Sequence, residues 1–202
     1  MLAEQFTETF RDEHRRMRDM LLGLMEAFQT NDSEGIRAGI EEISVHAAPH
    51  FLYEEEALYP ALVGLYGEEY VNNKLLAEHD LALEAAQKLL ELAQAEEIDE
   101  DASRYGIELV RQLLPHVSER DGLSVIVEIL EPETVDRIRK AQKKSKQSRT
   151  SLSALAARGK KRRTIARKPG GGTRKTVKPK AARPIAKPAR KAPRKAHRRR
   201  SA

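Results

Sequence analysis

Apolar residues recur at three- and four-residue steps through most of the first 140 residues, and this period is typical of amphipathic helices. The first predicted helix spans residues 3–29. The polar segment TNDSEG then supplies N-cap candidates in Asp32 and Ser33, and a second helix is predicted to run to about Leu65. The stripe of the first helix consists of Phe6, Phe10, His14, Met17, Leu21, Leu24 and Phe28.

Two further long helices are predicted, from about Tyr70 to Ala95 and from about Ala102 through His116. A short helix opened by Pro132 is predicted over residues 133–142. Pro49 and Pro115 are expected to kink or restart their helices, because proline removes one backbone donor. Four amphipathic helices with short polar turns predict an all-α fold, an antiparallel up-down four-helix bundle over residues 1–142.

The charge is divided sharply along the chain. Residues 1–140 hold 13 Lys+Arg and all 31 Asp+Glu, a net charge of −18, whereas residues 141–202 hold 24 Lys+Arg and no acid. The hydrophobic stripe also ends near residue 142. We therefore expect residues 143–202 to be a disordered tail rich in lysine, arginine, alanine and proline.

Cysteine is absent, which excludes disulfides and thiolate metal sites. The first residues, MLAEQFTETFRDEH, lack the basic and apolar regions of a secretory signal, and no apolar run approaches the length that spans a membrane. These features predict a soluble cytoplasmic protein without membrane association.

Each long helix carries a histidine on its apolar stripe. A single such histidine is more often a hydrogen-bonded core residue, but four of them, one per helix, favour a metal site. Glu54 follows His50 by one helical turn and therefore shares its face. An unpaired buried carboxylate is costly, and metal coordination offsets that cost. The four histidines are His14, His50, His79 and His116.

The neighbours of Glu54 and His116 have several possible roles. Glu55 and Glu56 are expected at the flank or surface, with Glu55 a possible hydrogen-bond partner of a ligand histidine. After His116, the candidate acids are Glu119 and Asp121, while Arg120 occupies the four-residue spacing. Imidazole and carboxylate ligands suit iron, manganese or zinc, and carboxylates can bridge two ions.

The chain resembles the hemerythrin-like HHE cation-binding family in RDEHRRM, HFLYEEEALYPAL, AEHDLAL and HVSERD, over residues 1 to about 140. The resemblance implies a four-helix bundle with a dinuclear non-haem iron centre. Glu54 and Asp121 would bridge the irons, and the histidines would be terminal ligands. Hemerythrins carry a second histidine one turn along the third helix, where this chain has Leu83. Either His46 replaces that ligand or Pro49 turns His46 to the surface; Glu119 is a substitute candidate for Asp121.

The basic tail resembles those of linker histones and histone-like bacterial proteins. Such a tail suits sequence-independent, salt-sensitive binding to duplex DNA, with RNA a further candidate partner. The alternatives are a solubilising tail, one that binds anionic surfaces, or one that folds back on its own acidic domain. The predicted nucleic-acid contacts are Lys160, Lys161, Arg162, Arg163, Arg167, Lys168, Arg174, Lys175, Lys178, Lys180, Lys187, Arg190, Lys191, Arg194, Lys195, Arg198, Arg199 and Arg200.

These features favour a di-iron protein that binds or senses O2 or a related small oxidant and is held at the nucleoid by its tail. One alternative is a redox enzyme with catalase-like or peroxidase-like activity that protects DNA. Another is a histone-like DNA-binding protein whose bundle is a metal-free structural module.

Overall fold

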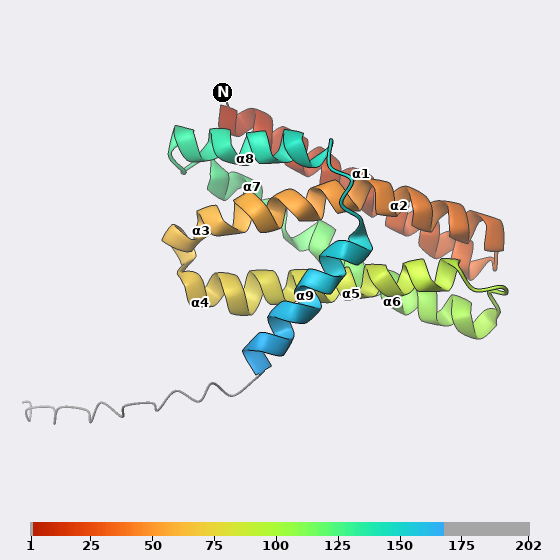
Figure 1. Cartoon of the computed structure of the whole chain (residues 1–202). Helices are drawn as coiled ribbons and strands as arrows, with labels where there is room; N and C mark the ends of the chain where they lie inside the picture. Colours follow the sequence, from red (N-terminus) through yellow and green to blue (C-terminus); the bar gives the residue numbers. More distant parts are fainter. Residues whose placement is uncertain (1, 168–202) are drawn as a thin grey trace, which may run out of the picture. The chain divides into compact units, whose positions relative to one another are not determined.

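The computed structural model describes residues 2–167, without the side chains of Asp121 and of residues 163–167. All regular secondary structure within this range is helical (Figure 1). Within the same range, no helix combines the length and the apolar character that spanning a bilayer requires.

Four long helices form the main bundle, and each contacts two of the others. Helix α1 packs against α2 and α6, and α5 packs against the same two helices, so that the four close into a ring. Asp32 caps α2 by accepting a hydrogen bond from the backbone N–H of Gly35, and Asp99 caps α6 through Ala102. The prediction of a helical bundle is thus confirmed. The four helices are α1 (Leu2–Gln29), α2 (Ser33–Tyr53), α5 (Ala77–Ala93) and α6 (Glu100–Glu119).

The second and third predicted helices are both interrupted by π-helical turns. Tyr59 N–H bonds to the carbonyl of Glu54, five residues earlier, which marks the first of these turns. Gly67, with φ of 82°, makes the sharp break between the two predicted helices. Pro49 does not restart its helix, since α2 continues through it to Tyr53. The elements of this region are η1 (Glu54–Leu58), α3 (Tyr59–Tyr66), α4 (Glu68–Tyr70) and η2 (Val71–Leu76).

Two apolar clusters fill the bundle, and along α1 one inward histidine separates them. Phe10 belongs to one cluster and Met17 to the other, with His14 between them. The cluster around Phe10 is completed by α7 (Asp121–Val127) and α8 (Pro132–Ser145), which both contact α1. The level of the bundle at which His14 lies, called the polar layer below, is therefore enclosed by apolar packing on both sides.

The folded part of the chain extends well beyond the boundary expected at residue 142. Helix α8 ends at Ser145, and a further helix, α9 (Leu152–Arg167), contacts α5 and α2 (Figure 1). Leu152, Leu155 and Ala156 are buried in the core cluster around Met17. The expectation of disorder is thus wrong for residues 152–167, because the short run LSALAA buries an apolar face. The rest of the expected tail, residues 168–202, lies outside the described residues.

A buried leucine on α9 provides a test of this extension. Leu155 is fully buried, so Leu155→Ala should lower the free energy of unfolding by about 2–5 kcal/mol. The control is Leu81→Ala on α5. Leu81 is 58% exposed, so this variant should change stability little. Urea titrations followed by circular dichroism measure both. Equal midpoints for the two variants would contradict the docking of α9.

Candidate metal centre

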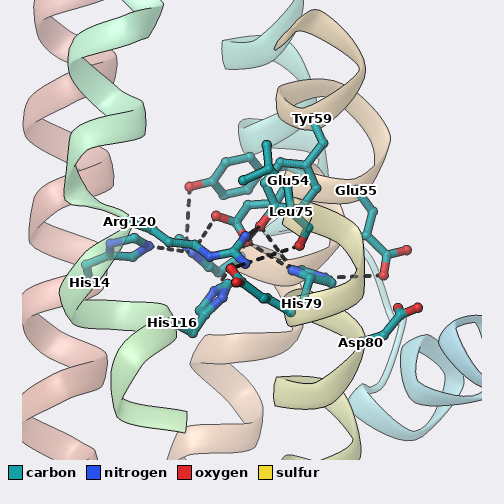
Figure 2. A network of polar contacts seen from close by, with 12 residues as sticks. His14, Glu54, Glu55, Tyr59, Leu75, His79, Asp80, His116 and Arg120 are labelled. Carbon is teal, nitrogen blue, oxygen red and sulfur yellow. Dashed lines mark hydrogen bonds and ion pairs between the residues drawn. The ribbon is translucent and has the colours of Figure 1, made fainter. Parts of the chain in front are cut away.

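Four buried side chains from different parts of the bundle meet at one point. His14 comes from α1, His50 from α2, Glu54 from η1 and His116 from α6. Each offers one nitrogen or oxygen atom, and these four atoms all lie within 4.8 Å of one another. Figure 2 shows His14, Glu54, His79 and His116 pointing toward this common centre. The sequence predicted all of these residues as ligands.

The carboxylate of Glu54 faces histidines on both sides. Its Oε1 atom lies 3.4 Å from His50 Nε2. Its Oε2 atom lies 3.3 Å from His79 Nδ1 and 3.3 Å from His116 Nε2. On the Oε1 side, His50 Nε2 is itself 3.0 Å from His14 Nε2. The two oxygens are therefore divided between two pairs of imidazoles.

Several buried polar atoms at this point have no hydrogen-bond partner among the described residues. They include Glu54 Oε1 and both ring nitrogens of His116. Buried polar atoms are almost always paired, because leaving one unpaired costs free energy. Nitrogen and carboxylate oxygen atoms are ordinary metal ligands, so a bound cation would satisfy Glu54 Oε1 and His116 Nε2, the ring nitrogen that faces Glu54. The residues present thus fit the metal that the resemblance implied.

Burial and close charges shift the pKa values of these groups in opposite directions. Burial favours the neutral form of Glu54, yet the neighbouring histidines outweigh this effect and hold its pKa well below the usual value. His50 is buried too, but the carboxylates of Glu54 and Glu13 raise its pKa to about 9. Burial dominates at His116 and lowers its pKa to about 4. Without metal, one proton therefore resides on His50.

The π-helical turn η1 places Tyr59 beside Glu54. Residues five apart lie on different faces of an α-helix, whereas the wider π turn brings them together. Tyr59 accordingly donates a hydrogen bond to Glu54 Oε2 at 2.9 Å. Its hydroxyl oxygen accepts a hydrogen bond from Arg120 at 2.6 Å. Tyr59 thus links the central carboxylate to a buried cation.

Arg120 follows His116 by one helical turn and enters the same polar layer (Figure 2). Arg120 is 6% exposed, and its guanidinium also donates to the carbonyl oxygen of Leu75 and to Glu78, at 3.1 Å each. The sequence showed this spacing but gave no partner for the guanidinium, because Tyr59 and Leu75 are distant along the chain. Sequence reasoning therefore missed both Tyr59 and Arg120.

Two carboxylates contact the outer sides of the candidate ligands. Glu13 Oε2 lies 3.2 Å from His50 Nδ1 and accepts a hydrogen bond from Tyr53 at 2.9 Å. Glu55 Oε1 lies 3.2 Å from His79 Nε2, a nitrogen that makes no hydrogen bond among the described residues. Burial alone would raise the pKa of both carboxylates, but their polar and charged partners hold each pKa at about 2.

Two other predicted ligands, His46 and Glu119, are not part of this cluster. His46 is half-buried and lines a surface cavity together with Pro49 and His50. Glu119 is exposed, and the side chain of Asp121 is not among those described. Leu83, at the position of the second histidine in hemerythrins, is fully buried in the apolar core.

The predicted nucleic-acid contacts fall mostly beyond the described part of the chain. Lys160 and Lys161 are exposed on α9. Arg162 instead contacts the carboxylates of Glu55 and Asp80. The side chains of Arg163 and Arg167 are outside the description, as is every predicted contact from Lys168 to Arg200.

Comparison with known proteins adds one positive result. A model of the hemerythrin HHE cation-binding domain matches residues 5–123, which is more than half of the chain. Neither the search of curated proteins nor that of solved structures found a match. The matched range contains every residue of the histidine–glutamate cluster and ends before α8 and α9.

The raised pKa of His50 makes a prediction for the metal-free protein. His50 binds its proton more tightly in the folded state than in the unfolded state, where its pKa is 6.5. The bound proton therefore stabilises the folded state fully below pH 6.5, and this stabilisation is lost as the pH rises through about 9. The free energy of unfolding of chelator-treated protein should therefore fall between pH 6.5 and 9. Urea titrations of His50→Gln should show a much shallower decline. If the free energy of unfolding of His50→Gln falls as steeply with pH as that of the wild type, His50 is not the source of the decline.

Proposed function

The chain belongs to the hemerythrin HHE cation-binding domain family, and we propose that it is a non-haem iron protein that binds dioxygen or a related small oxidant. The observation that carries this proposal is the buried convergence of three histidines and one glutamate from separate elements. Imidazole and carboxylate ligands without thiolate are a donor set that iron accepts. The family match and this cluster together support a metal-binding domain.

A dinuclear centre is the arrangement that the shared carboxylate supports. Glu54 Oε1 faces His50, and Glu54 Oε2 faces His79 and His116. Two ions would thus be held by Glu54 together with the histidines on each side of it. Inward glutamates and histidines of helical bundles are known to hold paired iron ions.

The surroundings suit a small, apolar ligand. Phe10 packs against His14 with ring centroids 4.2 Å apart, and Phe51 packs against His116 at 4.6 Å. A cavity of about 20 Å³ adjoins His116 and is otherwise lined by apolar residues such as Met17 and Leu113. A cavity of this size holds about one water-sized molecule, and its apolar lining favours a small apolar molecule over water. Bound iron would supply the electrons and a site for the ligand, while these residues would limit what reaches it.

The hydrogen bonds around Glu54 give it a fixed orientation. Tyr59 holds Oε2 by donating its hydroxyl proton, and Arg120 holds the Tyr59 oxygen in turn. This arrangement keeps the proton on Tyr59, because burial and the charge of Glu54 raise the pKa of that hydroxyl well above its usual value. Tyr59 therefore acts as a hydrogen-bond donor to the carboxylate rather than as an anionic ligand.

Iron analysis with two glutamate variants tests the proposal. Protein loaded with Fe²⁺ under nitrogen and desalted should retain about two irons per chain, the number that paired carboxylate centres of helical bundles hold. Admission of air should change its near-ultraviolet and visible absorption. Glu54→Gln should lose most of the iron, whereas Glu56→Gln, which alters an exposed neighbour, should retain it.

The same samples define the contradicting outcomes. Equal iron content in Glu54→Gln and the wild type would contradict the role of the cluster. A wild-type protein that retains no iron and is equally stable would favour a metal-free structural bundle. Rapid loss of added hydrogen peroxide would favour a redox enzyme over a binding or sensing protein.

We also propose that the C-terminal segment beyond α9 binds nucleic acid and places the protein at the nucleoid of the cytoplasm. Residues 168–202 contain 14 Lys+Arg and no acidic residue. They contain no aromatic residue either, which removes the usual stacking platform for single strands and favours duplex DNA. Binding through phosphate neutralisation is independent of sequence and weakens with salt.

A truncation placed by the structure tests the tail proposal. Ending the chain after Arg167 keeps α9 and removes the segment proposed to bind DNA. In gel-retardation assays the full chain should bind duplex DNA of unrelated sequences with similar affinity, and the affinity should fall steeply with salt. The truncated chain should bind very weakly. Undiminished binding by the truncated chain would place the DNA contacts within residues 1–167 instead.

A further inference from the structure

Two candidate ligand histidines are backed by carboxylates that themselves contact cations near the C-terminal end of the described chain. His50 contacts Glu13, and Glu13 Oε1 lies 2.9 Å from Lys146 Nζ at the end of α8. His79 contacts Glu55, and Glu55 is held by Arg162 of α9. Each histidine is therefore the first member of a chain of three groups, which runs from imidazole through carboxylate to cation.

The pair formed by Arg162 and Glu55 has the geometry of a strong ion pair. Arg162 donates two parallel hydrogen bonds to the two carboxylate oxygens, at 3.0 and 2.8 Å. The side chain of Glu55 is only 5% exposed, and that of Arg162 is 34% exposed. A two-point contact shielded from water restricts both groups far more than a single surface contact does.

The position of Arg162 is fixed by the close packing of α9 on α5. A Cβ atom at Gly159 would lie 2.6 Å from Asp80 Oδ1, so only glycine permits this approach without displacing Asp80. Arg162 lies three residues after Gly159 and also bonds to Asp80, the neighbour of His79. Leu155 anchors the same helix in the core. The guanidinium is thus held against the His79 segment from several directions.

The pair formed by Lys146 and Glu13 is more exposed. The side chain of Lys146 is 54% exposed and that of Glu13 is 19% exposed. Gln142 of α8 also donates a hydrogen bond to Glu13, at 3.3 Å. Since water screens the lysine contact, we expect Lys146 to contribute less than Arg162.

We propose that Arg162, and to a smaller extent Lys146, are positioning residues of the metal centre, acting through Glu55 on His79 and through Glu13 on His50. A carboxylate at the outer nitrogen of a ligand histidine fixes the ring orientation and tautomer and raises ligand basicity. The cation fixes the carboxylate. Both cations lie outside the matched domain of residues 5–123, so the basic C-terminal helices complete the centre. This inference rests on the proposed metal binding.

The first test compares arginine variants of α9 in protein loaded with Co²⁺, whose absorption bands report coordination geometry. Loss of a carboxylate beside a ligand histidine costs about 10- to 100-fold in metal affinity, so Arg162→Ala, which acts through that carboxylate, should weaken Co²⁺ binding by up to about 10-fold and shift these bands. Arg162→Lys, which keeps the charge but loses the two-point contact, should lie between Arg162→Ala and the wild type. The matched control is Arg158→Ala, which removes an exposed contact with Glu56 and should leave affinity and bands unchanged.

A double variant separates action through Glu55 from a general loss of stability. If Arg162 acts through Glu55, then Arg162→Ala combined with Glu55→Gln should bind Co²⁺ no more weakly than the weaker of the two single variants. Additive losses would overturn the proposed route. Wild-type affinity and bands in Arg162→Ala would overturn the role of Arg162 itself.

A measurement without metal distinguishes failure of this inference from failure of the proposed function. Long-range ¹H–¹⁵N spectra of the metal-free protein report which ring nitrogen of His79 carries the proton. Because Nδ1 faces Glu54 and Nε2 faces Glu55, we expect the wild type and Arg158→Ala to share one distribution of the ring proton over the two nitrogens, and Arg162→Ala to shift it away from Nε2. The same tautomer in all three would overturn the inference even if the wild type binds metal. Failure of the wild type to bind Co²⁺ or iron would instead contradict the proposed function.

Discussion

The carboxylate of Glu54 lies in the middle of the bundle with no exposure to solvent, and the rest of the polar layer is arranged around it. A buried charge without partners would cost several kcal/mol. Here three imidazoles and the Tyr59 hydroxyl surround the two oxygens, yet Oε1 still lacks a hydrogen bond. The apolar clusters on either side hold these groups close together. A metal cation is the partner that completes the layer.

The bundle and its inward histidines could be predicted because their signals are local. The apolar period in each segment determines which residues face inward, and His14, His50, His79 and His116 all fall on those stripes and are buried. Glu54 could be assigned because it lies one turn after His50. The proximity of two residues on one helix face can be predicted without knowing the tertiary fold.

The other features of the fold and of the site depend on contacts between segments that are distant along the chain. Tyr59 reaches Glu54 only because a π-helical turn replaces an α-helical one, and the sequence carries no clear signal for that turn. Helix α9 was missed because its apolar run is short and lies among basic residues, whose partners Glu55 and Asp80 come from the acidic domain. Part of the basic segment thus folds back on that domain, as one of the alternatives held.

Anomalous X-ray scattering from iron-loaded crystals would show whether the histidine–glutamate cluster holds iron. Data collected on both sides of the iron absorption edge locate the metal independently of the protein atoms. Strong peaks are expected on the two sides of the Glu54 carboxylate, within coordinating distance of His14, His50, His79 and His116. Peaks confined to surface carboxylates, or no peak in the bundle of a crystal that contains iron, would contradict this expectation.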